Sequence, residues 1–529
     1  MFSLLKDRSW RLAIITILGL SFLLLEIVIL VLYRETWFDE LLYLFKGRAA
    51  IGGSLVPFQD MIIAHPPLAF LLHGITQYIW GPSILLGRIV SSIIFFGILW
   101  IMYVIADRYA GALAGVGALF LMVSNVFLVG NYVSAVPFGL SVIFILLSIW
   151  VELLKISSQR KTLLSAFLIG LAVLTRINLL PAAIMYVLFL AVTRRGWREI
   201  GSFSIVFVVI LFLGFTPFLL LDFSLAISVI LAPFVSIGLL SSLPSSVKAD
   251  GFSFSEFLPT IVSFVREYDL TLLLFFAVTS LLLFSVWNTR DRFLKTEPVY
   301  VLLLMIGTGL FIPHYFYWKI SGSLVYANYF FPFLILAIVI GIFRFFPEKK
   351  VLIVFLVGVI SLNFLGNMFR TDIISHPNDE TDLERINRGA MLLKKHTNPE
   401  DLIIAFDNSI FHVFAADRVT KGPLLNRNFM FVGLPDTSLV NRILHYNPEI
   451  LLTWIDNADY VVLHEEKWPW TFRRTFRSVD GYDSEAFIHQ VERLLNDRYV
   501  LEDRAFNVYP RKYTEGNDGG TLLLYRRIK

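Results

Sequence analysis

Long apolar runs dominate the first two thirds of this chain and restrict it to a bundle of membrane-spanning helices. The runs follow one another from residue 11 to about residue 369 and then stop. The 529-residue chain is 57% hydrophobic, its mean hydropathy is +0.71, and only 16% of its residues are charged. Because so few charges would not keep a globular chain of this size in water, we expect a polytopic membrane protein.

We expect about eleven spanning helices, since a hydrocarbon core of about 30 Å needs roughly 20 apolar residues per helix. Two runs, 162–175 and 179–193, are short for that thickness, so they are tilted or partly broken unless one boundary is misplaced. The expected spans are 11–33, 84–106, 111–130, 137–154, 162–175, 179–193, 200–220, 270–287, 298–313, 324–343 and 350–369.

Basic residues set the expected orientation. Lys and Arg gather in every second loop, which we assign to the cytoplasm together with the N-terminus. Loops 34–83 and 221–269 then face outward, as does everything after the eleventh span. Within loop 34–83, an apolar piece from Pro66 to Pro82 is expected to lie as a helix in the membrane interface. A twelfth spanning helix is the alternative, but it would invert the charge assignment of every later loop.

Beyond the last apolar run the composition becomes that of a soluble domain. We therefore expect a transmembrane domain at 1–369 and a small extracytoplasmic α/β domain at 370–529, in a protein of the cell membrane. Expected strands are Leu402–Phe406, Tyr460–Leu463, Tyr499–Glu502 and Thr521–Arg526, and expected amphipathic helices are Asp382–Lys395, Ser438–Tyr446 and Glu485–Asn496.

Charge and cysteine content narrow the possible functions. The net charge is +4, and the basic residues lie at helix ends rather than in a groove, so no nucleic-acid partner is expected. The absence of cysteine excludes disulfides, thiol nucleophiles and zinc–thiolate sites. The sequence also has no GxGxxG, Walker or HExxH motif and no internal repeat, so no nucleotide and no metal site is assigned.

An acidic pair, Asp39 and Glu40, follows the first apolar run and is the candidate catalytic feature. A carboxylate at the membrane surface can act as general base on an acceptor hydroxyl. Adjacent residues cannot share one face of a helix or strand, so only one of the two should point into a site. A solvated loop acid is the alternative, but Trp37, Phe38 and the apolar stretch from Leu41 embed the pair.

Several outward residues are candidates for substrate binding. Arg176 lies between the two short runs, where a guanidinium suits a lipid phosphate, with snorkelling to the interface as the alternative. His65 precedes a double proline and could contact a phosphate or a sugar, unless it is simply a turn histidine. His314, Lys319 and Tyr329 flank the last outer loop, where rings could stack on a sugar and a cation could neutralise phosphate, unless they form an aromatic belt. Lys46 and Arg48 are further outward cations, whereas Arg88 begins a spanning helix and is expected to be structural.

In order and spacing these motifs resemble the GT-C glycosyltransferases, most closely the branch of the protein O-mannosyltransferases and the lipid A aminoarabinose transferase. The resemblance extends over about residues 1–345. The residues that carry it are Asp39-Glu40, His65-Pro66-Pro67-Leu68, Gly81, Gly87-Arg88, Leu174-Thr175-Arg176 and Tyr326–Pro332.

The resemblance implies an enzyme that transfers one sugar from a polyprenyl phosphate on the outer membrane face. It implies a donor such as dolichyl-phosphate mannose, Asp39 as the catalytic acid residue and Arg176 as a lipid-phosphate ligand. Attack by an acceptor hydroxyl with Asp39 as base would invert the anomeric centre. The acceptor, whether protein, glycan or lipid, is open. No soluble cofactor is expected, and a requirement for a divalent metal stays open.

The sequence also departs from the family pattern. Relatives carry an acid before a proline in the second outer loop, where this chain has Val136, so the resemblance supplies no second acid or acid-borne metal site there. The lysine that some relatives place beside the proline of the interfacial helix is absent, which leaves phosphate binding to Arg176, Arg48 or Lys319. The WWDYG motif of oligosaccharyltransferases is absent too. A transporter or flippase of lipid-linked sugars, or a non-catalytic membrane assembly protein, is the alternative to an enzyme.

Overall fold

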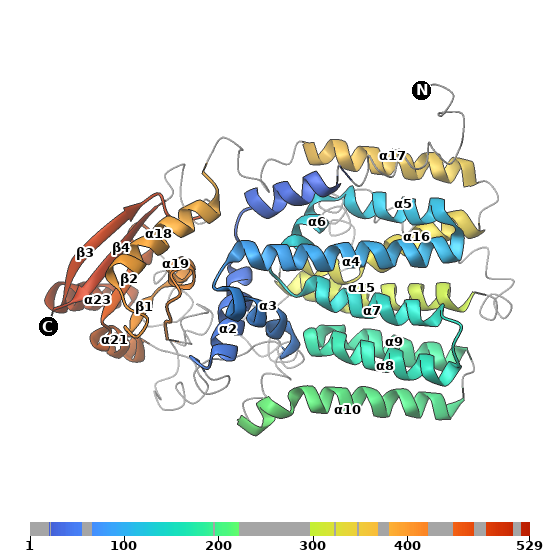
Figure 1. Ribbon diagram of the computed structural model, residues 1–529, viewed down its shortest axis with the longest axis horizontal. Helices are drawn as coiled ribbons and strands as arrows, with labels where there is room; N and C mark the ends of the chain where they lie inside the picture. Colours follow the sequence, from blue (N-terminus) through green and yellow to red (C-terminus); the bar gives the residue numbers. More distant parts are fainter. Residues whose placement is uncertain are drawn as a thin grey trace.

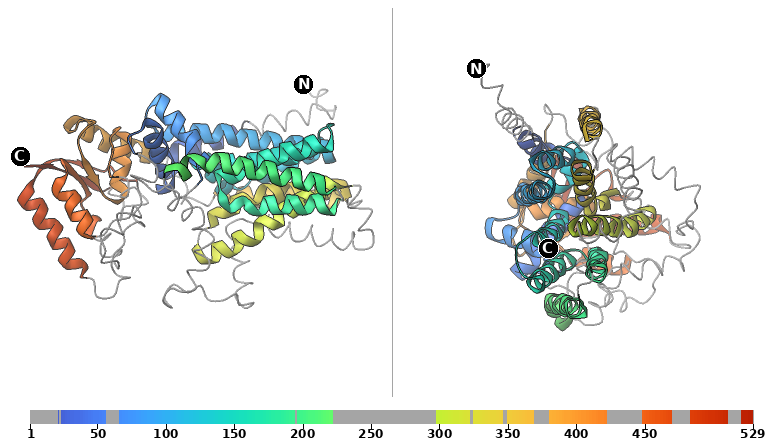
Figure 2. Two further views of the ribbon diagram at one scale, coloured as in Figure 1. Left: turned by 90° about the horizontal axis from the view of Figure 1, so that it is seen from below. Right: turned by 90° about the vertical axis from the view of Figure 1, so that its right-hand side faces the viewer.

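The computed structural model describes residues 21, 23–55, 66–193, 196–221, 297–321, 324–345, 349–368, 380–421, 448–469, 483–510 and 520–528. Most of the described helices run along one common direction in a single bundle. A small domain with a β-sheet sits beyond one end of that bundle, and two shorter helices, α2 and α3, lie between the two (Figure 1). The turned views in Figure 2 agree with this arrangement.

The described part of the bundle begins with a helix at Leu23–Tyr33. The labelled helices that follow are α2 (Phe38–Gly52), α3 (Leu68–Trp80), α4 (Ile84–Ala110), α5 (Ala112–Val123), α6 (Val126–Val133), α7 (Phe138–Glu152), α8 (Ser158–Thr175), η2 (Ile177–Leu179), α9 (Leu180–Val192), α10 (Trp197–Leu221), α15 (Pro298–Ser321), η3 (Leu324–Tyr329), α16 (Phe331–Phe345) and α17 (Lys349–Met368).

Length and apolar composition identify two described helices that could each cross a membrane, α4 and the Trp197–Pro217 part of α10. The pair α5 and α6 would make a third, although the two helices meet at 82°. Asn125 explains this bend, because its side chain accepts a hydrogen bond from Leu128 N at 3.0 Å and so starts a new helix. The expected span at 270–287 lies outside the described residues, and the count of eleven stays a prediction.

The short runs at 162–175 and 179–193 are helical and are separated by a break at Arg176. α8 ends there because Arg176 is extended, with φ of −148°. After the single turn of η2, Pro181 stands in the first turn of α9, where its missing N–H costs no hydrogen bond. The break therefore places an arginine between two helix ends rather than inside a span.

α2 and α3 cross at two glycines. A Cβ on Gly47 would lie 2.6 Å from Phe70 O, and a Cβ on Gly74 would lie 2.6 Å from Gly47 O, so the two backbones touch. One side of α3 packs on α2, whereas Leu71, Ile75 and Ile79 form an exposed apolar stripe on the other side. With 13 residues α3 is too short to span a bilayer, and its two-sided character fits the expected interfacial helix.

The small domain beyond the end of the bundle, called the outer domain for that position in the fold, has a four-stranded sheet in the order β1-β2-β4-β3, covered by helices (Figure 1). β1 and β2 are parallel, and β4 is antiparallel to both β2 and β3. Its elements are α18 (Asp382–His396), β1 (Ile403–Ala405), η4 (Asp407–Ser409), α19 (Ile410–Ala415), α21 (Pro448–Asn457), β2 (Tyr460–His464), α23 (Ser484–Arg498), β3 (Tyr499–Phe506) and β4 (Thr521–Arg527).

All four expected strands and two of the expected helices are present in this domain, and the helix expected at Ser438–Tyr446 lies outside the described residues. α19 docks the domain onto α2. Phe411 meets Phe38 edge to face with ring centroids 6.3 Å apart, and the Phe414 and Phe45 centroids are 6.0 Å apart. The outer domain thus rests directly on the helix that carries the acidic pair.

Candidate active site

A buried ion pair fixes the start of α2. Glu40 and Arg88 are both fully buried, and the carboxylate accepts two hydrogen bonds of 2.9 Å, from Nε and from Nη2 of Arg88. Ala135 N and Trp37 N donate to the same carboxylate at 2.9 and 3.1 Å. Burial raises the pKa of Glu40, but the arginine and the backbone donors outweigh it, so the net shift is downward.

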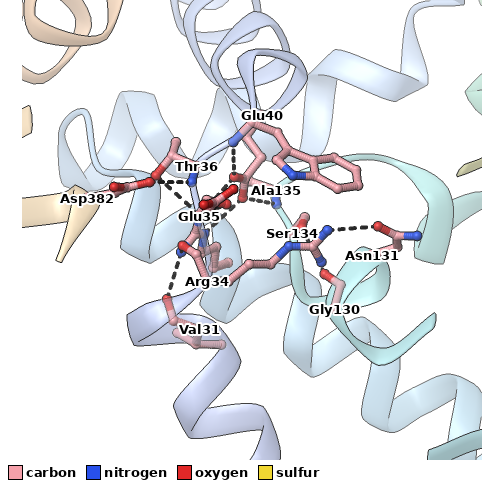
Figure 3. A network of polar contacts seen from close by, with 12 residues as sticks. Val31, Arg34, Glu35, Thr36, Glu40, Gly130, Asn131, Ser134, Ala135 and Asp382 are labelled. Carbon is pink, nitrogen blue, oxygen red and sulfur yellow. Dashed lines mark hydrogen bonds and ion pairs between the residues drawn. The ribbon is translucent and has the colours of Figure 1, made fainter. Parts of the chain in front are cut away.

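The same arginine holds the loop before α2. Arg88 Nη1 donates to the carbonyls of Val31 and Arg34 at 3.1 and 3.0 Å. Figure 3 shows this loop enclosed by the turn after α6 on one side and by Asp382 on the other. Asp382 accepts a hydrogen bond from Thr36 N at 2.8 Å, although the two residues are 346 positions apart. Arg88 is therefore structural, as expected, and the loop leading to the acidic pair has little freedom.

Asp39 points elsewhere. It is exposed, whereas its neighbour Glu40 is buried, so the expectation that adjacent acids diverge holds. Helical spacing places Asp39, Tyr43 and Lys46 on one side of α2. Asp39 stands in the first turn, where the helix dipole stabilises a carboxylate. Its charge acts through space on both Tyr43 and Arg176.

Arg176 reaches into the same region from the break between α8 and α9. Only 6% of its surface is exposed, and its guanidinium carbon lies 5.1 Å from the ring centre of Tyr43 and 5.3 Å from that of Phe138. Rings around a guanidinium keep it charged and hold its plane in place. Asp39 and Arg176, which are far apart in sequence, therefore belong to one site.

Two further predicted residues join them. Tyr329, at the end of η3, packs edge to face on Phe138 with centroids 5.3 Å apart, and its ring is 5.1 Å from that of His314 on α15. Tyr132 OH donates to Asn328 O, which ties η3 to α6. Four of the residues singled out from the sequence, Asp39, Arg176, His314 and Tyr329, thus converge from four separate elements.

The protonation of His314 follows from its hydrogen bond. Nδ1 lies 2.7 Å from Leu310 O, and a carbonyl oxygen only accepts, so Nδ1 carries the proton. The other ring nitrogen, Nε2, is buried and has no hydrogen-bond partner among the described residues. A neutral imidazole in this tautomer offers Nε2 as an acceptor, which suits a sugar hydroxyl better than a phosphate oxygen.

Arg48, another of the predicted residues, does not join this site. Arg48 pairs with Asp417 of the outer domain, with Nη2 2.6 Å from Oδ1, and also donates to Gln77 O. The residue His65 and the side chain of Lys319 lie outside the described part of the chain. Among described residues no group of three or more His, Asp or Glu side chains is arranged to hold a metal ion.

Tyr43 and Phe138 are residues of this region that the sequence did not assign to a site, and Lys46 was named from the sequence only as an outward cation. Lys46 is 2% exposed, and burial lowers its pKa to about 7. Lys46 follows Asp39 by seven residues, and this helical spacing could have predicted from the sequence that both lie on the same side of α2. Nothing in the sequence could have indicated Asp382, because its contact with Thr36 depends on how the outer domain docks.

Comparison with solved structures identifies the fold. A crystal structure of ArnT from Cupriavidus metallidurans bound to undecaprenyl phosphate superimposes with a TM-score of 0.62 at 12% identity, over 96% of this chain and 97% of that one. The apo form of the same protein gives 0.55 at 11% identity, over 97% and 98%. The chain therefore shares the fold of that protein along nearly its whole length. No protein-family model matches the sequence, and a search of curated proteins gives no match.

Proposed function

We propose that this protein is a glycosyltransferase that takes a single sugar from a polyprenyl phosphate and transfers it to an acceptor at the outer face of the membrane. The observation that carries the proposal is that the guanidinium of Arg176 lies over the ring of Tyr43, which stands one turn after Asp39 on the same side of α2. A base and a buried cation are the two groups that displacement of a phosphate from a sugar requires.

The fold supports the choice of carrier. ArnT of Cupriavidus metallidurans, which shares the fold, was crystallised with undecaprenyl phosphate. In this chain Arg176 would bind the phosphate of such a lipid, because a guanidinium matches two phosphate oxygens at once. Lys46, on the same side of α2 as Asp39, would add a second positive charge.

The reaction follows from these placements. An acceptor hydroxyl attacks the anomeric carbon while Asp39 takes its proton, and the new C–O bond forms on the face opposite the phosphate. The bond between the anomeric carbon and the phosphate oxygen breaks, and the electron pair leaves with the lipid phosphate, whose charge Arg176 stabilises. The product has the inverted configuration. We propose Asp39 alone as the base, because four N–H donors already occupy the carboxylate of Glu40.

The sugar and the surroundings complete the proposal. His314 Nε2 would accept a hydrogen bond from a hydroxyl of the sugar, and Tyr329 would contact its ring face. We retain a mannose-like sugar as the donor that the family resemblance implies. The site faces outward, with the N-terminus cytoplasmic and the domain from about residue 370 extracytoplasmic, where it would contribute to binding the acceptor.

The proposal is tested with purified protein in lipid nanodiscs, labelled polyprenyl-phosphate sugars and membrane or glycan acceptors. Asp39→Asn should lower sugar transfer by about 10²- to 10⁴-fold while binding of undecaprenyl phosphate persists. Arg176→Gln should weaken the binding of undecaprenyl phosphate and lower the rate of sugar transfer by about 10²-fold or more. Arg176→Lys should recover part of both losses.

Matched controls lie at the other end of the bundle. Asp107 and Arg108 end α4, about 30 Å of helix away from Arg88, so Asp107→Asn and Arg108→Gln should leave transfer unchanged. Full activity of the Asp39→Asn protein would remove the proposed base. A label that changes leaflet but stays on its lipid would identify a transporter instead.

A further inference from the structure

A cavity, called the second cavity because it is distinct from the proposed transfer site, lies on the other side of α2, where the outer domain docks. Its volume is about 300 Å³, within the size range of small-ligand sites. Both domains line it, with α2 and α3 on one side and α19, the segment after it and Pro399 on the other. The lining residues used below are Phe45, Arg48, Tyr78, Phe414, Asp417 and Arg418.

This cavity is separate from the proposed transfer site. Arg48 follows Asp39 by nine residues on α2, which is two and a half turns, so the two side chains leave the helix on opposite sides about 14 Å apart. A ligand here is therefore not the reacting sugar. Whatever it binds, the cavity does not depend on the proposed reaction.

An ion pair at the cavity offers both kinds of hydrogen-bonding group. Arg48 donates from Nε and Nη2 to Oδ1 of Asp417, at 3.1 and 2.6 Å. No described residue donates to the other carboxylate oxygen, Oδ2, so it can accept. The second N–H of each terminal nitrogen of Arg48 remains a donor, because each terminal nitrogen makes one contact, to Asp417 or to Gln77.

The carboxylate is held in place by its neighbour. Asp417 has φ of +59°, a left-handed conformation that few residues other than glycine adopt. Arg418 fixes this turn, since it donates to Ala416 O at 3.2 Å and to Thr397 O at 2.6 Å. Strained backbone that is held in this way is typical of functional positions.

The chemistry of the lining fits a pyranose ring. One face of such a ring carries C–H groups that pack on aromatic rings, here Tyr78, Phe45 and Phe414, while its rim carries hydroxyls that both donate and accept. A phosphate fits less well, because the guanidiniums of Arg48 and Arg418 already bond to protein oxygens and the Asp417 carboxylate would repel an anion.

The cavity also borders the exposed apolar side of α3. Tyr78 lines it and, being 57% exposed, continues the apolar stripe that Leu71 and Ile75 begin on α3. We propose that this cavity is a carbohydrate-binding site that holds a neutral pyranose unit, supplied either by a glycolipid headgroup or by a free saccharide. Occupancy would also bridge the two domains, because Arg48 and Asp417 come from different ones.

The test is saturation-transfer NMR on the full chain in phosphatidylcholine nanodiscs, with the methyl pyranosides of glucose, mannose, galactose and N-acetylglucosamine as probes. Asp417→Asn and Tyr78→Leu should each weaken the signal of the bound sugar about tenfold. Because Asp417→Asn also breaks the interdomain ion pair, Tyr78→Leu supplies an effect that does not pass through that pair. Matched controls are Asp497→Asn on α23 and Trp80→Leu at the end of α3, both exposed and neither among the lining residues of the cavity.

Nanodiscs doped with a monoglucosyl diacylglycerol distinguish the two sources. If the glycolipid is the ligand, it should displace the free pyranosides and bind more tightly than they do, whereas a free-saccharide site should be indifferent to it. Absence of signal from every pyranoside and from the glycolipid would overturn the proposal. So would equal signals in the two cavity variants and the wild type, or losses of the same size in the controls. The binding experiment contains no sugar donor, so it does not depend on the proposed reaction. A failure to observe sugar transfer would count against the first site only.

Discussion

At the scale of single residues, two neighbouring carboxylates have opposite surroundings. Glu40 is enclosed by Arg88 and backbone donors, whereas Asp39 is exposed on the side of α2 that faces Arg176. Buried ion pairs are costly to break from one side, because the remaining charge is left without a partner. The two neighbouring carboxylates therefore have different roles. Glu40 fixes the start of the helix, and Asp39 is the carboxylate that we propose as the base.

For Asp382, a role in positioning the proposed base can be tested separately from a role in folding. Its carboxylate holds Thr36 N, three residues before Asp39, so Asp382→Asn should loosen the loop that positions the proposed base. We expect kcat for sugar transfer to fall about tenfold, the worth of one charge-assisted hydrogen bond, with little change in KM for the donor. Steady-state kinetics check this, together with faster hydrogen exchange of residues 34–40.

The exposed residue Asp497 again supplies the control for this change. Its conversion to Asn should alter neither kcat nor the exchange of the loop. An Asp382→Asn protein with normal kcat, or one in which KM alone rises, would show that the hydrogen bond to Thr36 does not position Asp39.

At the scale of elements, the site depends on breaks in helices rather than on the helices themselves. Arg176 stands between α8 and α9, and the turn that donates Ala135 N to Glu40 follows α6, which itself begins at a bend. Each break frees a side chain or a backbone N–H at the end of the bundle. α2 and α3 then close that end, held at the distance that two facing glycines allow.

Gly74→Ala should disrupt this crossing. The new Cβ would meet the backbone of Gly47 at 2.6 Å, which no side-chain rotation can relieve. We expect a loss of about 1–3 kcal/mol in stability, the usual cost of overpacking, measured as a lower thermal midpoint in nanodiscs. Gly201→Ala on α10 is the matched control, since nothing lies within 4 Å of its Cβ position. If both variants melt alike, the close approach of α2 and α3 is not required.

At the scale of the whole molecule, the outer domain and the bundle are joined at the site. Asp382 contacts the loop before α2, Asp417 pairs with Arg48, and α19 packs its phenylalanines on α2. The same docking surface thus restrains the proposed base on one side of α2 and forms the second cavity on the other. Substitutions in the outer domain should therefore affect the transfer site through their contacts with α2.

Acid should weaken the outer domain. His412 and His464 are buried there beside Tyr509, and burial lowers the pKa of each from 6.5 to about 4. The unfolded chain therefore binds protons that the folded domain does not, and each histidine removes up to about 1.4 kcal/mol of stability per pH unit as the pH falls from 6.5 to 4. Above pH 6.5 the two histidines no longer lower the stability of the domain.

Hydrogen exchange measured by mass spectrometry, corrected for the intrinsic effect of pH, checks this expectation. Peptides from β1 and β2 should lose protection between pH 6.5 and 4, and His412→Asn should flatten that dependence. The exposed His489 is the control, because His489→Asn should leave the slope unchanged. A wild-type domain equally protected at both pH values would contradict the assignment.

The sequence by itself determined the class of molecule, because hydrophobic periodicity and run length act locally. They indicated a membrane bundle followed by an α/β domain, an interfacial helix after Pro66, and the break between two short helices at Arg176. Asp39, Arg176, His314 and Tyr329 could be singled out because polar residues at the ends of apolar runs are costly unless they have a use.

Only the tertiary structure decided which of these residues meet. That Glu40 pairs with Arg88, that Arg48 reaches Asp417, and that Asp382 holds the loop before Asp39 all depend on contacts between segments far apart in the chain. Such contacts are set by the packing of whole elements, and packing leaves no periodic trace in the sequence. From the sequence alone an acidic residue is therefore only a candidate for a catalytic role. Its neighbours in the tertiary structure decide whether its carboxylate supports the fold or acts as a base.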